Sequence, residues 1–256
     1  MLHFFEKGQG PALLFLHGFC ETGEMWRHLA DSLSSQYRVL CPDLPGFGSS
    51  PITHPITCLE DVAEQLEEWI DALQIQQPIV LGHSLGGYVA LALLERMGNR
   101  IKAIGLLHST AYADDLDKKE MRNRVLIFLN KHGAAKFVSS FVPQLFPEHR
   151  REELADATAH AIEDGQRSSL EGLLAYTVAM RDRQDRIAVL QQFAGPKLLL
   201  AGTLDGAVKI DSSRAQQQYF THYTELEGVG HLGMVEEKEK TLAVVQDFVR
   251  EVLSSS

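Results

Sequence analysis

Short apolar segments alternate with longer amphipathic segments along most of this chain, and this alternation constrains the fold more than any other feature. The apolar segments, such as Ala12–Leu16, are continuous and do not alternate with polar residues. Continuous apolar runs are typical of strands in a parallel sheet that is covered on both faces. We predict strands at residues 2–5, 12–16, 37–41, 78–81, 101–107, 197–201 and 222–226.

The amphipathic segments between these strands predict helices. In residues 58–73, for example, Leu59, Val62 and Leu66 follow the helical i, i+3, i+4 spacing. Thr57 and Glu60 predict a capping box at the start of this helix. The predicted helices are residues 24–34, 58–73, 85–97, 213–219 and 235–253. The repeated order of strand, helix and strand predicts a doubly wound α/β domain with right-handed crossovers.

Residues 111–190 interrupt this order, because they show helical periodicity but no good strand. We interpret them as a helical cap inserted into an α/β core formed by residues 1–110 and 191–256. The alternative is that these helices pack on the flank of the sheet. A charged run at residues 236–240 is interpreted as the solvated start of the last helix.

Charge and hydropathy exclude several classes of partner. The chain has 24 Lys and Arg against 34 Asp and Glu, which gives a net charge of −10. This acidity argues against nucleic acid and against anionic membranes as partners. The first residues do not resemble a signal peptide, and no apolar run is as long as a membrane span, which needs about 18 residues. We therefore expect a cytoplasmic protein.

The cysteines and histidines give no support for a metal or a cofactor. The three cysteines are an odd number without a Cys-x-x-Cys spacing, and the histidines show no pattern typical of metal ligands. Gly46-Phe47-Gly48 lacks the further glycine and the Lys-Ser/Thr pair of a phosphate-binding loop. We expect no metal and no cofactor.

The segment Gly82-His83-Ser84-Leu85-Gly86 carries the clearest chemical signal. This Gly-x-Ser-x-Gly pattern follows a predicted strand and precedes a predicted helix, which is the context of a nucleophilic serine on a strained turn. Glycines at 82 and 86 allow the helix to fold back closely past the strand. The N–H of Leu85, at the helix N-terminus, is a candidate donor to a developing oxyanion.

Four blocks of sequence, in this order along the chain, resemble the α/β-hydrolase superfamily. They are Leu14-Phe15-Leu16-His17-Gly18-Phe19, Cys41-Pro42-Asp43-Leu44-Pro45-Gly46-Phe47-Gly48-Ser49-Ser50, Ala201-Gly202-Thr203-Leu204-Asp205 and Gly228-Val229-Gly230-His231. The resemblance implies the α/β-hydrolase fold, a mostly parallel doubly wound sheet with an inserted helical cap. It also implies that the backbone of Phe19 supplies a second oxyanion N–H.

A serine hydroxyl needs an adjacent base to attack an acyl carbon at neutral pH, and histidine is the side chain suited to this role. His231, in a glycine-rich loop after a predicted strand, is the best candidate. Asp205 would orient it, which gives the chain order Ser, Asp, His of this fold. Asp211 is the rival acid, but it is better interpreted as the cap of a helix that begins near Ser212.

Other polar residues near these motifs have structural interpretations. Asp43 is interpreted as an acid that shapes its own turn, and His17 and His83 as hydrogen-bonded scaffold residues.

The expected function is hydrolysis of a carboxylic ester or related acyl compound through a Ser-His-Asp triad and an acyl-enzyme. Serine at position 84 argues against the dehalogenase and epoxide-hydrolase branches, which use aspartate there. Carbon–carbon bond hydrolase, lactonase and cofactor-free haloperoxidase remain alternatives, as does a ligand sensor with slow turnover. A small, partly apolar substrate is expected. The candidate pocket residues are Phe128, Phe141, Phe146, Leu173, Tyr176 and Met180.

Overall fold

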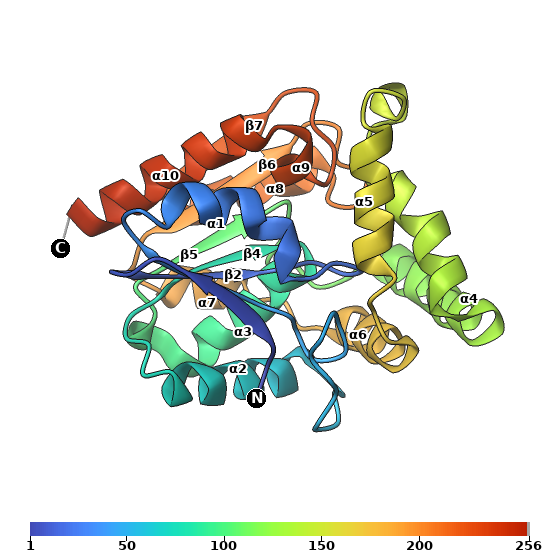
Figure 1. Ribbon diagram of the computed structural model, residues 1–256, viewed down its shortest axis with the longest axis horizontal. Coiled ribbons are helices and arrows are strands. Elements are labelled where there is room, and N and C mark those ends of the chain that lie inside the picture. The colour runs from blue at the N-terminus through green and yellow to red at the C-terminus, as the bar shows by residue number, and fades with distance from the viewer. Residues whose placement is uncertain (255–256) are drawn as a thin grey trace.

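The computed structural model describes residues 1–254, which form one seven-stranded sheet with helices on both faces (Figure 1). The strand order is β1-β3-β2-β4-β5-β6-β7, and all neighbours are parallel except β1, which pairs antiparallel with β3. The strands are β1 (Phe4–Lys7), β2 (Ala12–Leu16), β3 (Arg38–Pro42), β4 (Ile79–His83), β5 (Ala103–Leu107), β6 (Lys197–Gly202) and β7 (His222–Leu226). The predicted mostly parallel sheet is confirmed.

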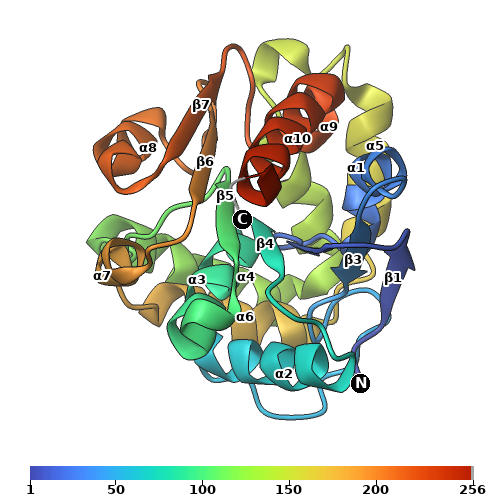
Figure 2. The ribbon, with the colours of Figure 1, turned by 90° about the vertical axis from the view of Figure 1, so that its left-hand side faces the viewer.

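Helices on the two faces bury the sheet, which explains why its central strands are continuously apolar. Every residue of β2, β4 and β5 is buried. Helices α1 (Arg27–Leu33) and α10 (Lys238–Ser254) contact each other on one face. The opposite face is covered by α2 (Leu59–Ala72), α3 (Leu85–Met97), α7 (Ile187–Gln192) and α8 (Ile210–Gln216), as Figure 2 shows.

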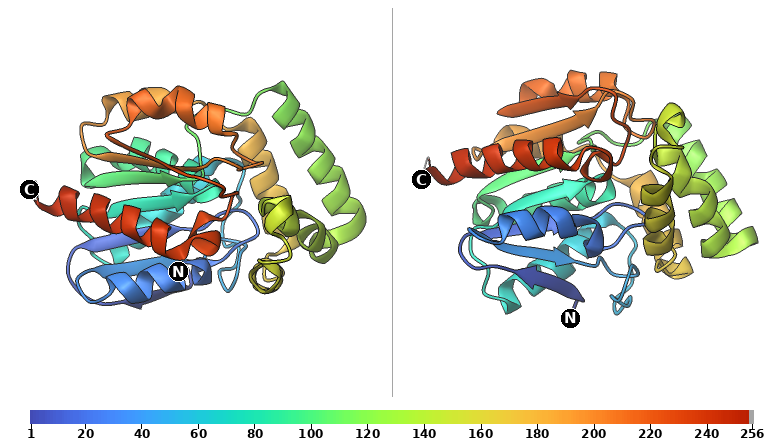
Figure 3. Two further views of the ribbon diagram at one scale, coloured as in Figure 1. Left: turned by 90° about the horizontal axis from the view of Figure 1, so that it is seen from above. Right: turned by 45° about the horizontal axis from the view of Figure 1, so that its top comes forward.

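The segment between β5 and β6 forms a separate group of helices beside the sheet (Figure 3). Its elements before α7 are α4 (Leu116–Phe141), η3 (Val142–Leu145), η4 (Glu148–Arg150), α5 (Ala155–Gly165) and α6 (Leu170–Asp182). Gly133, with φ 80°, interrupts α4 with a kink. Hydrogen bonds join this group to the loops after β2, β3 and β7, so it lies at the carboxyl ends of the parallel strands.

Most predicted elements match the structure to within a few residues, but three local predictions are wrong. The helix at residues 24–34 is divided into η1 (Gly23–Trp26) and α1, and the last helix into α9 (Gly233–Glu236) and α10. The capping box of α2 does not use Glu60. The Asp61 carboxylate instead accepts from the N–H groups of Thr57 and Cys58, because the helix begins one residue later than predicted.

Asp211 does not cap a helix, which corrects another prediction. Helix α8 begins at Ile210, so Asp211 lies inside its first turn, and the cap position is taken by Lys209. A carboxylate in the first turn still has a favourable interaction with the helix dipole.

Candidate active site

Ser84 lies on a sharp turn between β4 and α3. Its φ of 48° and ψ of −113° are unfavourable for a residue with a side chain, so the turn stores backbone strain. A Cβ atom at Gly82 would lie 2.3 Å from the carbonyl oxygen of Gly86, and one at Gly86 would lie 2.2 Å from that of Leu16. Only glycine therefore fits at either position, and the strained turn predicted from the motif is present.

The two candidate oxyanion donors, Leu85 and Phe19, lie at the ends of neighbouring strands. Leu85 is the first residue of α3, so its N–H has no acceptor within the helix. Phe19 lies in the turn after β2, where the next residue, Cys20, has a φ of 63°. The buried Glu21 carboxylate accepts from the N–H of Gly18 and thereby fixes this turn.

His231 and Asp205 form a buried hydrogen-bonded pair. Asp205 follows β6 and His231 follows β7, and His231 Nδ1 lies 2.8 Å from Asp205 Oδ2. The other carboxylate oxygen of Asp205 accepts from the N–H groups of Ala207 and Val208, both at 2.8 Å. The carboxylate is therefore held by the backbone on one side and by the imidazole on the other.

The electrostatics of this pair favour an ionised aspartate beside a basic histidine. Burial by itself raises the pKa of Asp205, but the charge and hydrogen bond of His231 and the nearby imidazole of His108 hold that pKa well below its ordinary value. Burial by itself lowers the pKa of His231, but the charge and hydrogen bond of Asp205 outweigh it. The pKa of His231 is therefore raised above 6.5.

His83 joins the serine turn to the loop that carries His231. Its Nε2 lies 2.9 Å from the carbonyl oxygen of His231, and its Nδ1 lies 2.9 Å from Glu21 Oε2. The rings of His83 and His231 are 4.8 Å apart. His231 is thus in direct contact with Asp205. It also lies near Ser84, because it contacts His83, the residue that directly precedes Ser84.

His17 has a similar scaffold position beneath the turn after β2. Its Nδ1 lies 2.8 Å from the carbonyl oxygen of Gly18, and its Nε2 accepts from the N–H of Leu44 at 2.9 Å. Asp43 accepts from the N–H groups of Gly23 and Ser49, both at 2.9 Å. These contacts agree with the structural interpretations of both residues.

Glu236 is a part of the site that sequence analysis missed. Its carboxylate accepts from the N–H groups of Gly230 and Leu232, at 2.9 and 3.1 Å, on either side of His231. It is buried, so the interpretation of residues 236–240 as a solvated helix start is wrong for Glu236. The backbone N–H of His231 also donates to the carbonyl oxygen of Leu145 in η3, at 3.0 Å.

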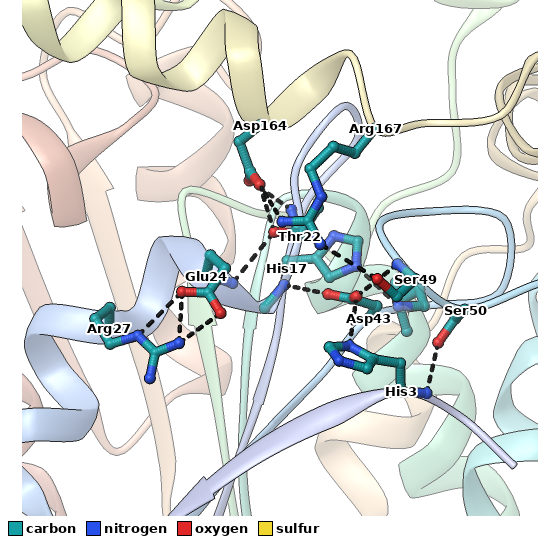
Figure 4. A network of polar contacts seen from close by, with 12 residues as sticks. His3, His17, Thr22, Glu24, Arg27, Asp43, Ser49, Ser50, Asp164 and Arg167 are labelled. Carbon is teal, nitrogen blue, oxygen red and sulfur yellow. Dashed lines mark hydrogen bonds and ion pairs between the residues drawn. The ribbon is translucent and has the colours of Figure 1, made fainter.

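Asp164 in α5 connects the inserted helices to the turn after β2 (Figure 4). It accepts from the backbone N–H and the hydroxyl of Thr22. Arg167 lies beside it and also contacts Ser49, in the loop that Asp43 shapes. The inserted helices are thus anchored to two loops that follow β2 and β3.

The candidate pocket residues divide into two groups. Phe141, Phe128 and Tyr176 belong to an aromatic cluster around Phe19: the ring of Phe141 lies 6.0 Å from that of Phe19, Phe128 contacts Phe137, and Tyr176 lies 4.9 Å from Phe47. Phe146, Leu173 and Met180 are buried in the core and belong to the packing of the inserted helices.

A groove of about 400 Å³ runs between α5 on one side and η1, α1 and α9 on the other. Its lining includes Cys20 and Glu21, which directly follow Phe19, but Ser84, Asp205 and His231 are not among its lining residues. It is therefore a neighbour of the site and not the site itself. Within residues 1–254, no group of three or more His, Cys, Asp or Glu side chains is arranged to hold a metal ion.

The strained turn of Ser84 and the buried His231–Asp205 pair lie at the carboxyl ends of a mostly parallel sheet, an arrangement typical of the α/β-hydrolase class. The chain belongs to the alpha/beta hydrolase fold family, whose model matches residues 11–238. The family and its named relatives support a hydrolase activity. No helix in the described part of the chain is long and apolar enough to cross a bilayer.

Several known proteins are similar to this chain over nearly its whole length. A pimeloyl-[acyl-carrier protein] methyl ester esterase from Aeromonas salmonicida is 30% identical over 94% of this chain and 96% of its own. 3-Oxoadipate enol-lactonase 1 from Acinetobacter baylyi is 26% identical over 94% of this chain and 90% of its own. A thermophilic esterase from Thermogutta terrifontis superposes with a TM-score of 0.91 at 26% identity, over 98% of this chain and 93% of its own.

Proposed function

We propose that this protein is a serine hydrolase that cleaves carboxylic esters or related acyl compounds through Ser84, His231 and Asp205. The observation that carries the proposal is the 2.8 Å hydrogen bond between His231 and Asp205, buried beside the strained turn of Ser84. Esterases among the similar proteins agree with this chemistry.

The proposed reaction has two acyl-transfer steps. His231 accepts the proton of Ser84 as the serine oxygen attacks the substrate carbonyl, and the N–H groups of Phe19 and Leu85 stabilise the oxyanion. Protonated His231 then donates to the leaving group, which leaves an acyl-enzyme on Ser84. Water, activated by the same histidine, releases the acid and restores the serine.

Residues 111–190 act in this proposal as a cap that selects the substrate. The aromatic rings of Phe128, Phe141 and Tyr176 lie around Phe19 or pack on its neighbours, which favours a substrate with an apolar part near the reacting carbonyl. Phe146, Leu173 and Met180 are buried within the same group of helices. No nucleic acid, membrane, metal or cofactor takes part in the proposed reaction.

A lactone is the second candidate substrate, because a lactone is a cyclic ester and is opened by the same two steps. The similarity to the Acinetobacter baylyi protein, which is named an enol-lactonase, favours lactones as a second class of substrate. Lactones and linear esters therefore belong in the same assay.

The test is a panel of p-nitrophenyl esters of increasing acyl length, together with simple lactones. Ser84→Ala and His231→Ala are expected to lose at least about 10⁴-fold in kcat, because triad residues act as a unit. His54→Ala, at an exposed histidine, is the matched control and retains activity. A fluorophosphonate probe is expected to label wild-type protein at Ser84.

Two results would reject the proposal. One is full activity in both Ser84→Ala and His231→Ala. The other is a folded wild-type protein that neither turns over any ester or lactone nor reacts with the probe, which would favour a ligand sensor.

A further inference from the structure

The residue that follows β5 occupies a central place in the site. In the sheet, β5 lies between β4, which leads to Ser84, and β6, which leads to Asp205. The residue directly after β5 is His108. Its N–H donates to the carbonyl oxygen of Leu200 at 2.7 Å, so its backbone is fixed at the edge where the candidate catalytic residues gather.

His108 adopts a backbone conformation that residues with side chains rarely use. Its φ is 49°, in the left-handed region. Outside glycine, this region is populated mainly by Asn, Asp and His, and strain of this kind is concentrated at functional sites. Strain alone does not show that His108 has a function, so the contacts of its imidazole decide the question.

The imidazole of His108 is fully buried against the acid of the proposed triad. Its Nδ1 lies 3.5 Å from Asp205 Oδ2, the same oxygen that His231 Nδ1 contacts at 2.8 Å. Within residues 1–254, neither ring nitrogen of His108 has a hydrogen bond of standard geometry, and Nδ1 approaches the Asp205 carboxylate at 3.5 Å.

The other side of the ring is packed against the first residue of α9, two positions after His231. A Cβ atom at Gly233 would lie 2.3 Å from His108 Nε2. The absence of a side chain at Gly233 therefore leaves room for the ring, and the packing turns Nδ1 toward Asp205. Burial lowers the pKa of His108, and the neutral ring then carries one proton, for which the carboxylate is the available acceptor.

We propose that His108 is a positioning residue for the catalytic acid: a neutral imidazole whose Nδ1–H faces Asp205 Oδ2 and shares that oxygen with His231. This inference rests on the proposed function. The two backbone N–H groups on Oδ1 and the two imidazoles on Oδ2 together hold the carboxylate plane in line with His231. His108 acts on the reaction only through Asp205.

The predicted consequence is a change in the basicity of His231. A second donor on Oδ2 draws negative charge away from the bond to His231, so loss of that donor strengthens the pull of Asp205 on the imidazolium. The charged and titratable groups around His231 are Asp205, Glu21, Glu236, His83 and His108. The first four are unchanged in a variant at position 108.

The experiment compares His108→Leu with His108→Asn, two side chains of nearly the same shape. The amide nitrogen of Asn stands where Nδ1 of His stands and can donate to Asp205, whereas Leu cannot, and Asn tolerates the positive φ. His108→Leu is expected to lose about tenfold in kcat, because the Asp205 carboxylate loses a polar group that orients it. In the pH profile of kcat/KM for His108→Leu, the acidic limb is expected to move to higher pH.

His108→Asn is expected to keep the wild-type acidic limb and most of kcat. Thermal unfolding of both variants checks the fold, and His108→Gly, which relieves the positive φ, replaces His108→Leu if that variant does not fold. Unchanged kcat and acidic limb in the variant without a donor would overturn the proposal. Equal losses in both variants, with no movement of the limb, would also overturn it, since they would indicate packing alone.

A second readout separates this inference from the proposed function. The titration of His231 is followed by NMR in a Ser84→Ala background, where no turnover is needed. A higher midpoint with His108→Leu than with His108→Asn supports the role of His108 whatever the enzyme's substrate. Equal midpoints overturn it. Retained activity in Ser84→Ala would overturn the proposed function instead.

Discussion

The carboxylate of Asp164 in α5 accepts two hydrogen bonds from Thr22, one from its backbone N–H at 3.0 Å and one from its hydroxyl at 2.6 Å. Thr22 lies three residues after Phe19, in the turn that presents the proposed oxyanion N–H. The inserted helices therefore hold the turn directly, at a position 142 residues away in sequence.

Breaking this contact is expected to loosen the oxyanion turn. Asp164→Ala and Thr22→Val are each predicted to lower kcat by about tenfold, since hydrogen bonds to a charged group contribute about 1.5–3 kcal/mol. Asp164→Ala removes both hydrogen bonds and Thr22→Val only that of the hydroxyl, so the double variant is expected to be little worse than Asp164→Ala alone. Steady-state kinetics and urea unfolding measure this coupling, and Glu163→Ala, at an exposed residue of the same helix, is the control. Fully additive losses would contradict the prediction.

Glu236 is predicted to position His231 through its loop. Glu236→Ala removes the acceptor for the N–H groups of Gly230 and Leu232 and leaves both donors without a partner, at a cost of about 1–3 kcal/mol each where they are buried. We expect a decrease of about tenfold or more in kcat, with a smaller change in KM. Glu237→Ala, a substitution at the adjacent and more exposed residue, serves as the matched control. Equal kinetics in the two variants would rule out the assigned role.

The pH dependence of activity follows from the raised pKa of His231. The base must be neutral, so kcat/KM is expected to decrease as the pH falls, with a midpoint above 6.5. In Asp205→Asn the raising charge is lost while burial remains, so the midpoint is expected to move down and kcat to fall by about 10⁴-fold. The pH profile of each protein measures both effects. A midpoint in Asp205→Asn equal to or above that of the wild type would disprove the electrostatic argument.

The same two groups predict opposite contributions to folding stability. The raised pKa of His231 contributes stability that is complete below pH 6.5 and is lost as the pH rises through its folded value. The lowered pKa of Asp205 contributes stability that is present above pH 3.8 and is lost as the pH falls. These signs predict that the free energy of unfolding, measured against pH by urea unfolding, is highest between the two windows.

The serine turn is predicted to reject any side chain at Gly86. A Cβ atom there would lie 2.2 Å from a backbone oxygen of β2, which cannot move without disturbing the sheet. Gly86→Ala is expected to lower the free energy of unfolding by about 1–3 kcal/mol or more. Gly206→Ala is the control, because its Cβ would meet no atom within 4 Å. Denaturant unfolding compares the two, and equal stabilities would show that the turn is less crowded than described.

The central strands were predictable because their composition marks them. Ala12–Leu16 was predicted with the observed bounds because a strand covered on both faces must be apolar throughout. His222–Leu226 is polar and only partly buried, and it was predicted as the continuation of the series of strands. Helix starts were less predictable. Whether Glu60 or Asp61 closes the cap of α2 depends on a shift of one residue in the helix start, and sequence patterns do not define helix ends to one residue.

The candidate site was predictable only where a motif defines a local backbone. The turn of Ser84 is of this kind, because two glycines and a serine at fixed spacing describe its geometry. Asp164 and His108 act across large distances in sequence, and Glu236 acts on the nearby residues Gly230 and Leu232, but no local pattern distinguishes any of the three. A weak signal for His108 was available: it directly follows a predicted strand, and residues in that position gather at the binding edge of an α/β sheet.

The hydrogen bond from the N–H of His231 to the carbonyl oxygen of Leu145 limits how this architecture can be re-engineered. Chimaeras that exchange the helical insertion to change substrate preference would also exchange a support of the proposed general base, His231. A transplanted insertion would therefore have to provide a main-chain acceptor at the place of Leu145, or the graft would lose turnover before it gained a new specificity.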